Sequence, residues 1–388
     1  CKRPLAHLIM QRTGVGYING WLSDSTCGQP SAEVDWMQEK ALCIAIPPED
    51  GSGTIDQFLR ILTILKEKGD ATHIEPHTFE THESAIKALN EAKVDLILLS
   101  AEVWAKMNHH GLELAATLPR REATWVLISE DKAEYLPKNA LLICPHRMLR
   151  RQMRRARKDV HTMSLEDAFD RFEKPQDESW SSIVPWMEKL REQGEIDGYI
   201  IDRGHWAAAG IRARRHTLGM HRGDPERAHF IPPTFSGLSV LLSRKSFPYE
   251  RTNIFNDRPA ETAFTNELEL WSQIPSSIRD LVGIHVEQRG IGTILREAEE
   301  SEDLSLTESF MDRDGRVARK GSRVEIRMET LNVNGKRTIA IERTGPLEYA
   351  YEERVLTMLE WQELLAVALE KRPNKDDLTL VEQFLSPY

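Results

Sequence analysis

The chain has 388 residues, enough for two or three domains that each bury a core, which excludes a small scaffold held together by disulfides. Hydrophobic residues make up 40% and charged residues 29%, a balance typical of a soluble globular protein, and no stretch approaches the roughly 20 apolar residues that cross a bilayer. The formal net charge of -10 argues against general attraction to a polyanion, so any anion site must be local.

Residues 1–40 are rich in Gly, Ser, Asp and Thr and carry no sustained hydrophobic period, which predicts an N-terminal extension. Its aromatic residues Tyr17, Trp21 and Trp36 suggest that parts of it dock onto another surface. The sequence starts at Cys1, and three origins of this start stay open. An organellar targeting peptide was removed, the cysteine is the lipidated first residue of a lipoprotein, or the sequence is truncated.

Strands and helices alternate from residue 41 to about residue 120. The apolar run 41–46 predicts a buried strand that prolines end, and apolar residues recur at helical spacing between 58 and 65. A second helix is expected over 85–92, and the continuous apolar run 94–99 predicts a strand that is covered on both faces. This alternation predicts an α/β domain.

A similar alternation begins again after residue 120. Three apolar runs predict strands: 123–128, 140–144 and 198–201. A very basic helix is expected over 147–158 and another helix over 206–211, whereas the polar segment 173–182 is expected to be an inserted loop.

The pattern changes after about residue 250. A helix is expected over 260–273, and the strands 324–328 and 338–341 flank Asn334-Gly335, the strongest short turn signal in the chain. An amphipathic helix over 352–371 completes a predicted α+β domain.

The chain has four cysteines: Cys1, Cys27, Cys43 and Cys144. Their spacing predicts neither a disulfide framework nor a metal site, and favours a reducing compartment. Since His109, His110 and His205 also lack spacing-matched partners, we expect them to be core or surface residues, and no metal site is predicted.

Several fragments between residues 136 and 159 resemble one known family. Leu136-Pro137 is followed by the strand 141–144, by Leu149-Arg150-Arg151-Gln152 and by Arg157-Lys158-Asp159. This order is similar to the LP, short strand, SSLRRQ and RPDL pattern of hydroxymethylbilane synthase, also called porphobilinogen deaminase. Further fragments resemble other family motifs in the same order: 90–98, 194–201, 207–211 and 231–240. The resemblance covers about residues 41–372.

The resemblance implies three domains. Two α/β domains of the type II periplasmic-binding-protein kind would face each other across a cleft, with a C-terminal α+β domain after them. The first domain is expected at 41–119 and 225–248, the second at 120–224 and the third at 250–372, followed by a tail at 373–388.

The residues that the family uses for chemistry are replaced in this chain. The family attaches a dipyrromethane primer through a thioether to a cysteine in the third domain, whereas no cysteine follows Cys144 and the matching stretch 276–283 has no thiol. No dipyrromethane cofactor is therefore expected. The position of the catalytic aspartate in the family's HSMKD motif is occupied by Val103 here, so the neighbouring Glu102 is the one catalytic candidate. The alternative is that Glu102 is only a solvated charge at the end of a strand.

Arginines carry what remains of an anion site. The family binds substrate carboxylates with arginines, and Arg150 and Arg151 occupy the matching LRRQ positions, but the arginines of two other motifs are missing near 46–50 and 163–166. The predicted anion- or ligand-binding residues form a basic stripe: Arg147, Arg150, Arg151, Arg154 and Arg155. This stripe is a solvated face paired with acids, a contact for RNA phosphate, or a retained tetrapyrrole or polycarboxylate site.

The leading hypothesis is a pseudoenzyme, a hydroxymethylbilane synthase-like protein kept for binding or for structure. We expect protein partners in a larger assembly, such as a mitochondrial ribosome, inside a mitochondrion or plastid. The alternatives are an active porphobilinogen deaminase-type transferase with a rearranged site, a tetrapyrrole- or anion-binding protein, and a protein that contacts RNA through residues 147–158. A cytoplasmic location also stays open.

Overall fold

The computed structural model describes most of the chain after residue 40. The described residues are 41–48, 52–69, 73–107, 111–175, 177–220, 228–300, 302–311, 314–316 and 321–369. They belong to one compact unit, residues 41–388. The predicted N-terminal extension, the C-terminal tail, His109 and His110 lie outside the described residues.

The first sheet contains strands from two separate parts of the sequence. Its order is β2-β1-β3-β10-β4, with β1 parallel to β2 and β3, and β10 antiparallel to β3 and β4. Its strands are β1 (Leu42–Ile46), β2 (Ile74–Thr78), β3 (Leu96–Ser100), β4 (Leu112–Thr117) and β10 (Ser239–Arg244). The helices that follow its strands are α1 (Thr54–Lys68), α2 (His82–Asn90) and α3 (Ala101–Lys106).

Alternate residues of β1 face opposite sides of this sheet. Ile44 packs with Phe58 of α1, whereas Ala45 packs with Ala85 and Leu89 of α2. Because both faces are covered by helices, nearly every side chain of β1 and β3 is buried, as the apolar runs 41–46 and 94–99 predicted.

The second sheet is built from a continuous part of the chain. Its order is β7-β6-β8-β5-β9, with β6 parallel to β7 and β8, and β5 antiparallel to β8 and β9. Its strands are β5 (Trp125–Ser129), β6 (Leu141–Ile143), β7 (His161–Met163), β8 (Gly198–Asp202) and β9 (Arg215–Leu218). Its helices are α4 (Arg147–Ala156), α5 (Leu165–Arg171), α6 (Trp180–Glu192) and α7 (Arg203–Ala209).

The prediction of a loop over 173–182 is wrong at its C-terminal end, because α6 begins at Trp180. Pro185 lies in the second turn of α6, where the missing N–H disturbs few helical hydrogen bonds. The burial of Val184, Met187 and Leu190 against the second sheet stabilises this helix more than local propensity does.

The third sheet is antiparallel, in the order β11-β12-β13. Its strands are β11 (Val282–Gly290), β12 (Ser322–Leu331) and β13 (Thr338–Pro346), and its helices are α8 (Arg258–Gln273), α9 (Ile291–Glu300), α10 (Leu304–Phe310) and α11 (Ala350–Leu369). Short 3-10 helices complete the chain: η1 (Ala133–Tyr135), η2 (Tyr249–Arg251), η3 (Asn253–Phe255), η4 (Ser276–Leu281) and η5 (Leu347–Tyr349). The hairpin around Asn334-Gly335 is confirmed, and Gly335 has a φ of 69°.

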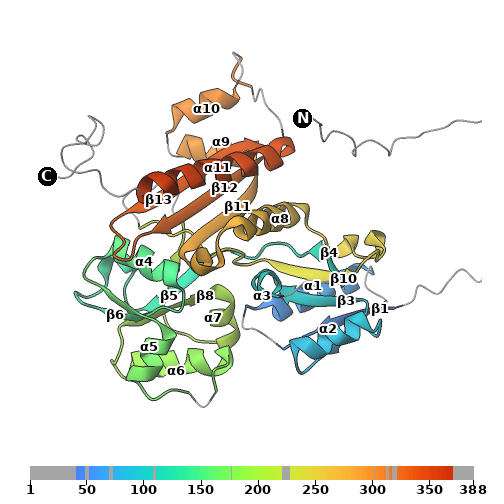
Figure 1. Cartoon of the computed structure of the whole chain (residues 1–388), viewed down its shortest axis with the longest axis horizontal. Helices are drawn as coiled ribbons and strands as arrows, with labels where there is room; N and C mark the ends of the chain where they lie inside the picture. The colour runs from blue at the N-terminus through green and yellow to red at the C-terminus, as the bar shows by residue number, and fades with distance from the viewer. Residues whose placement is uncertain are drawn as a thin grey trace, which may run out of the picture. The chain divides into compact units, whose positions relative to one another are not determined.

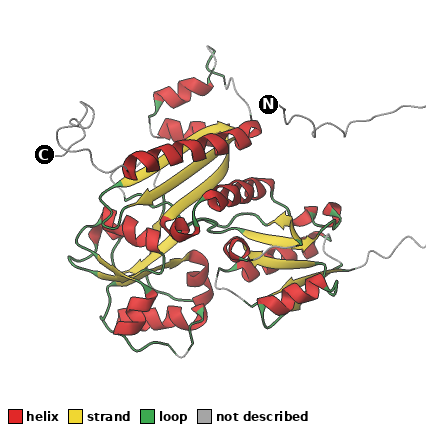
Figure 2. Cartoon of the chain, viewed as in Figure 1, coloured by secondary structure: helices red, strands yellow, loops and turns green. Residues whose placement is uncertain are grey.

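The fold class expected from the sequence is confirmed. Two α/β units and one C-terminal α+β unit make up the described chain, as Figures 1 and 2 show. Among the described residues, no helix combines the length and the apolar character needed to span a bilayer.

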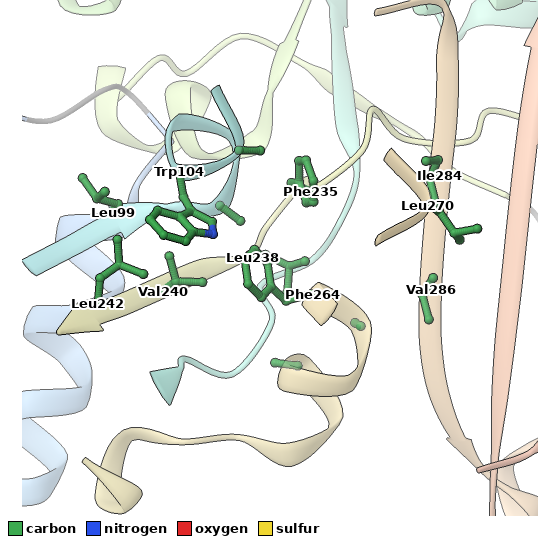
Figure 3. Packing of buried hydrophobic residues seen from close by; sticks show 14 of the residues in the cluster. Leu99, Trp104, Phe235, Leu238, Val240, Leu242, Phe264, Leu270, Ile284 and Val286 are labelled. Carbon is green, nitrogen blue, oxygen red and sulfur yellow. The ribbon is translucent and has the colours of Figure 1, made fainter. Parts of the chain in front are cut away.

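One hydrophobic cluster joins the first sheet to the third. It runs from Trp104 of α3 through Phe235 and Leu238 to Phe264 of α8 and Ile284 of β11 (Figure 3). Since burial of each such side chain contributes about 1.5–3 kcal/mol, this cluster fixes the C-terminal unit on the first α/β unit.

The opposite face of the third sheet is charged and also buried. Along β12, Glu325, Arg327 and Glu329 are each at most 7% exposed. The Arg289 guanidinium lies 3.0 Å from the Glu325 carboxylate, and Arg327 lies 2.7 Å from the same residue. These ion pairs satisfy charges that would otherwise be costly to bury.

Candidate functional site

The chain crosses between the two α/β units twice, at 118–124 and at 231–238, and both crossings are fixed by one carboxylate. Glu267 of α8 is fully buried, and its Oε1 accepts from Arg120 Nη1 at 2.7 Å and from the Val286 N–H at 3.0 Å. Its Oε2 accepts from the Phe235 N–H at 2.8 Å. Since Arg120 and Phe235 lie on different crossings, Glu267 holds both against the C-terminal unit.

A cavity of about 410 Å³ lies between the two α/β units, and its lining includes residues of α3 and α7. Figure 1 shows these two helices on neighbouring sides of the two units. The first α/β unit contributes Ser52, Ser100, Glu102 and other residues of α3, and the second contributes the loop after β6 and the start of α7. Polar and charged side chains line this space together with apolar and aromatic ones, among them Trp125, Trp180 and Phe235, so it offers both hydrogen-bonding groups and rings to a ligand. We call this space the cleft.

Arg121, on the first crossing, lies at the centre of the contact between the units. Its guanidinium donates to the Ser52 carbonyl, whereas its Nε is buried with no hydrogen-bond partner in the described part of the chain. Gly204 approaches the same carbonyl so closely that a Cβ there would lie 2.0 Å from the oxygen. This close approach separates the cleft from a second cavity, also of about 410 Å³, which contains Trp206 and Arg215. Arg215 stacks on the Trp206 ring at 3.9 Å.

Two histidines in the cleft are held by tryptophan rings. The His205 ring stacks on Trp180, with ring centroids 4.0 Å apart, and is 8% exposed. His146 meets Trp125 edge-on at 5.9 Å, and Trp125 Nε1 donates to the Ser236 hydroxyl at 3.2 Å. Burial lowers the pKa of His146 to about 4, so its imidazole is neutral at physiological pH. A neutral imidazole has one donor and one acceptor nitrogen for a ligand.

Glu102, the catalytic candidate from the sequence, does line the cleft, but not on a strand. The chain turns into α3 at Ser100, whose hydroxyl caps the helix by accepting from the Val103 N–H at 3.3 Å. The expectation of a strand end is therefore wrong. Glu102 lies 2.6 Å from Lys106 one turn later, and this ion pair is exposed to solvent.

The basic stripe lies on α4, where most of its guanidinium groups contact the protein itself. Arg147 pairs with Asp280 at 3.0 Å, and Arg150 donates to the Cys144 and Pro145 carbonyls at 2.7 and 3.0 Å. Arg150 therefore fixes the loop that carries His146 into the cleft.

The other three arginines of the stripe reach the C-terminal unit. Arg151 donates to the Leu331 carbonyl, Arg154 to the Val333 carbonyl at 2.9 Å, and Arg155 lies 2.7 Å from Glu329. None of the five arginines lines the cleft. Arg147 and Arg155 thus pair with acids, whereas the other three donate to backbone carbonyls, and anion or RNA binding by the stripe stays a prediction.

Neither cysteine in the described residues is placed for chemistry in the cleft. Cys144 is fully buried, and burial raises the pKa of its thiol to about 12, so almost no thiolate forms at neutral pH. Cys43 lies on β1. The stretch 276–283, where the resemblance places a primer cysteine, forms η4 and the start of β11.

Sequence reasoning missed the residues that shape the cleft most directly: Arg121, Trp180, Asp202 and Gly204. Asp202 caps α7 by accepting from the Gly204 N–H at 2.7 Å. A signal existed in Asp202-Arg203-Gly204, a capping residue after a buried strand. Ligands of open α/β sheets bind at the carboxyl ends of the strands, so the sequence could have predicted a site residue at Asp202.

Comparison with known proteins gives structural likenesses only. No protein-family model matches the chain, and no curated protein matches its sequence. The aliphatic sulphonate binding protein SsuA of Escherichia coli is 15% identical, with a TM-score of 0.33 over 84% of this chain and 94% of its own. The ligand-binding component of an ABC-type import system from Staphylococcus aureus is 14% identical, with a TM-score of 0.32 over 84% and 93%. At TM-scores this low the fold assignment rests on this chain's own strand order.

Proposed function

We propose that this chain is a non-catalytic binding protein of the hydroxymethylbilane synthase-like kind, and that the cleft is its ligand site. The observation that carries the proposal is the cavity of about 410 Å³ between the α/β units, lined by aromatic rings and by a half-buried arginine, with no thiol among its lining residues.

The missing cysteine of the C-terminal unit supports a binding role over pyrrole transfer. No cysteine follows Cys144 in the sequence, so a primer has no thiol on the C-terminal unit. Val103 occupies the position of the family's aspartate, and the neighbouring carboxylate of Glu102 is paired with Lys106. A pyrrole-condensing site would lack both the covalent anchor and the group that stabilises cationic intermediates.

The cleft supports one class of ligand best, a small planar molecule with one anionic group. The rings of Trp125, Trp180 and His205 present faces and edges for a planar body. Arg121 also lines this cavity, and its guanidinium is a cation that an anionic group could pair with. A single arginine suits one anionic group rather than the many carboxylates of a tetrapyrrole chain.

The test uses 8-anilinonaphthalene-1-sulfonate, which has a planar naphthalene ring system and one anionic group, as a fluorescent probe in titrations of the folded protein. We expect one site per chain and binding at least about tenfold weaker in Trp180→Ala, because stacking with an aromatic side chain and the burial it brings contribute on the order of 1–3 kcal/mol. Arg212 is exposed and outside the cleft, so Arg212→Ala is the matched control. Equal loss in both variants, or several equivalent sites, would contradict the cleft as the site.

The non-catalytic part of the proposal has a separate test. The purified protein is incubated with porphobilinogen, and its intact mass and any hydroxymethylbilane are measured. We expect no added dipyrromethane mass and no product. Formation of either would show a transferase with a rearranged site.

An exposed helix face favours a second role, as a subunit of a larger assembly. On α11, Tyr351, Val355, Leu359 and Val367 are 65%, 38%, 53% and 68% exposed, although helices on a protein surface normally turn polar residues outward. We place this assembly in a mitochondrion or plastid. Native mass from light scattering and fractionation of a tagged chain test these two points, and a free monomer in the cytosol would contradict both.

A further inference from the structure

A group of three metal-binding side chains lies on the first sheet. In the part of the chain that the structure describes, Cys43, Glu75 and His77 form a group whose ligand atoms all lie within 4.8 Å of one another. Neither cysteine nor histidine spacing predicted it, since Cys43 is far from the other two in the sequence.

The strand register explains why these side chains meet. In the parallel pair β1–β2, Cys43 lies opposite Glu75, and Ala45 lies opposite His77. Residues opposite each other in neighbouring strands share a face, and positions two apart on one strand share it as well. Ile44 and Ile74 point to the α1 face, so Cys43, Glu75 and His77 share the other one.

Ala45, the residue of β1 opposite His77, has a small side chain. Ala45 is fully buried under α2, so no bulky group on β1 separates the imidazole from Cys43. His77 Nε2 already lies 3.9 Å from a carboxylate oxygen of Glu75. Ligands of a tetrahedral zinc ion are roughly 3.5 Å apart, as bond lengths of about 2.0–2.3 Å require. Small rotations of the two exposed side chains therefore complete the geometry.

The three donors together select one kind of ion. A thiolate and an imidazole favour zinc and related transition metals over magnesium or calcium, which prefer oxygen ligands alone. A carboxylate is a common third ligand of zinc, and three protein ligands leave a fourth position for water.

We propose that Cys43, Glu75 and His77 form a binding site for a divalent transition-metal ion of the zinc type, on the edge of the first sheet. The site is separate from the cleft, because none of the three residues lines that cavity. It ties β2, an exposed edge strand, to the buried strand β1, and therefore stabilises the edge of the first sheet when the ion is bound.

Cobalt(II) titration of the whole chain tests the site, with a phosphine reductant to keep thiols reduced. We expect one equivalent to bind, with a thiolate-to-cobalt charge-transfer band and the intense visible bands of a four-coordinate ion. Zinc should displace the cobalt and remove these bands.

Four variants separate the proposed site from adventitious binding. Changes to groups that only support a metal ligand cost about 10–100-fold in affinity, so Cys43→Ser and His77→Gln should weaken binding by at least about tenfold. Glu80→Gln, an exposed acid nearby, and Cys27→Ser are the controls and should bind as the unchanged chain does. Circular dichroism confirms that each variant is folded.

The proposal is overturned if the unchanged chain shows no charge-transfer band at one equivalent of cobalt. It is also overturned if Cys43→Ser keeps that band, or if the controls lose affinity as much as the ligand variants do.

Discussion

Replacement of Glu267 by glutamine tests whether one buried carboxylate holds the two crossings together. The substitution keeps the shape of the side chain but removes its charge. Arg120, whose side chain is only 14% exposed, then has no counter-charge, and the new amide N–H₂ must face a backbone N–H of Phe235 or Val286. Removal of one partner of a buried ion pair costs about 3–5 kcal/mol. We expect a loss of that size in the free energy of unfolding.

Urea denaturation followed by tryptophan fluorescence and by circular dichroism measures this loss. Glu269→Gln is the matched control, because Glu269 is exposed on the same helix and should change stability by less than about 0.5 kcal/mol. Coincident transitions from the two probes are needed before the midpoints are converted to free energies, since a chain of several units can unfold in steps.

The reciprocal variant sharpens the test. Arg120→Met leaves the Glu267 carboxylate buried without its cation, so the two single losses should not add in the double variant. A loss below about 1 kcal/mol in Glu267→Gln, or strict additivity, would refute the idea that this pair is what fixes the crossings.

Two further predictions concern the cleft. The pKa of His146 is lowered from 6.5 to about 4 in the folded chain, so the unfolded chain binds more protons between these values, and the stability that is complete above pH 6.5 is lost as the pH falls toward 4. In His146→Gln the free energy of unfolding should fall less between pH 6.5 and pH 4, by at most about 3 kcal/mol, than it does in the unchanged chain. The same pH dependence in both proteins would contradict a lowered pKa of His146. In Gly204→Ala the new Cβ would lie 2.0 Å from the backbone oxygen of Ser52. We therefore expect the free energy of unfolding to fall by about 1–3 kcal/mol and the fluorescent probe to bind more weakly. Gly292→Ala, with no atom within 4 Å, should have neither effect, and equal behaviour of the two variants would count against the close contact.

Elements with a strong local pattern were predictable from the sequence. The continuous apolar runs gave β1 and β3, and Asn334-Gly335 located the hairpin of β12 and β13. Strand β2 was missed because Ile-Glu-Pro-His-Thr is polar and contains a proline, features that only an edge strand tolerates. α3 was missed because it is short and directly follows a strand, so Ser100 looked like a strand residue rather than a cap.

The candidate site was less predictable than the fold. Glu102, the catalytic candidate from the sequence, lines the cavity, and its catalytic role stays a prediction. Arg121 had no local signal, because its importance depends on Ser52 and Gly204, which reach it only in the folded chain. The stripe on α4 illustrates the opposite case. Its charge pattern was clear, but its partners are far away in the sequence, such as the Leu331 carbonyl on β12 and the Val333 carbonyl in the hairpin loop.

The position of β10 in the first sheet has a consequence for synthesis and folding. Among the described strands, β4 pairs with β10 alone, and β10 is made only after the whole second sheet has been translated. The second sheet uses a continuous stretch of chain and can therefore form on the ribosome, whereas the first must wait with one strand position open. During that interval the apolar edges of β3 and β4 are exposed, and such edges are prone to aggregate. Slow translation or truncation before residue 239 should thus leave this chain dependent on chaperones.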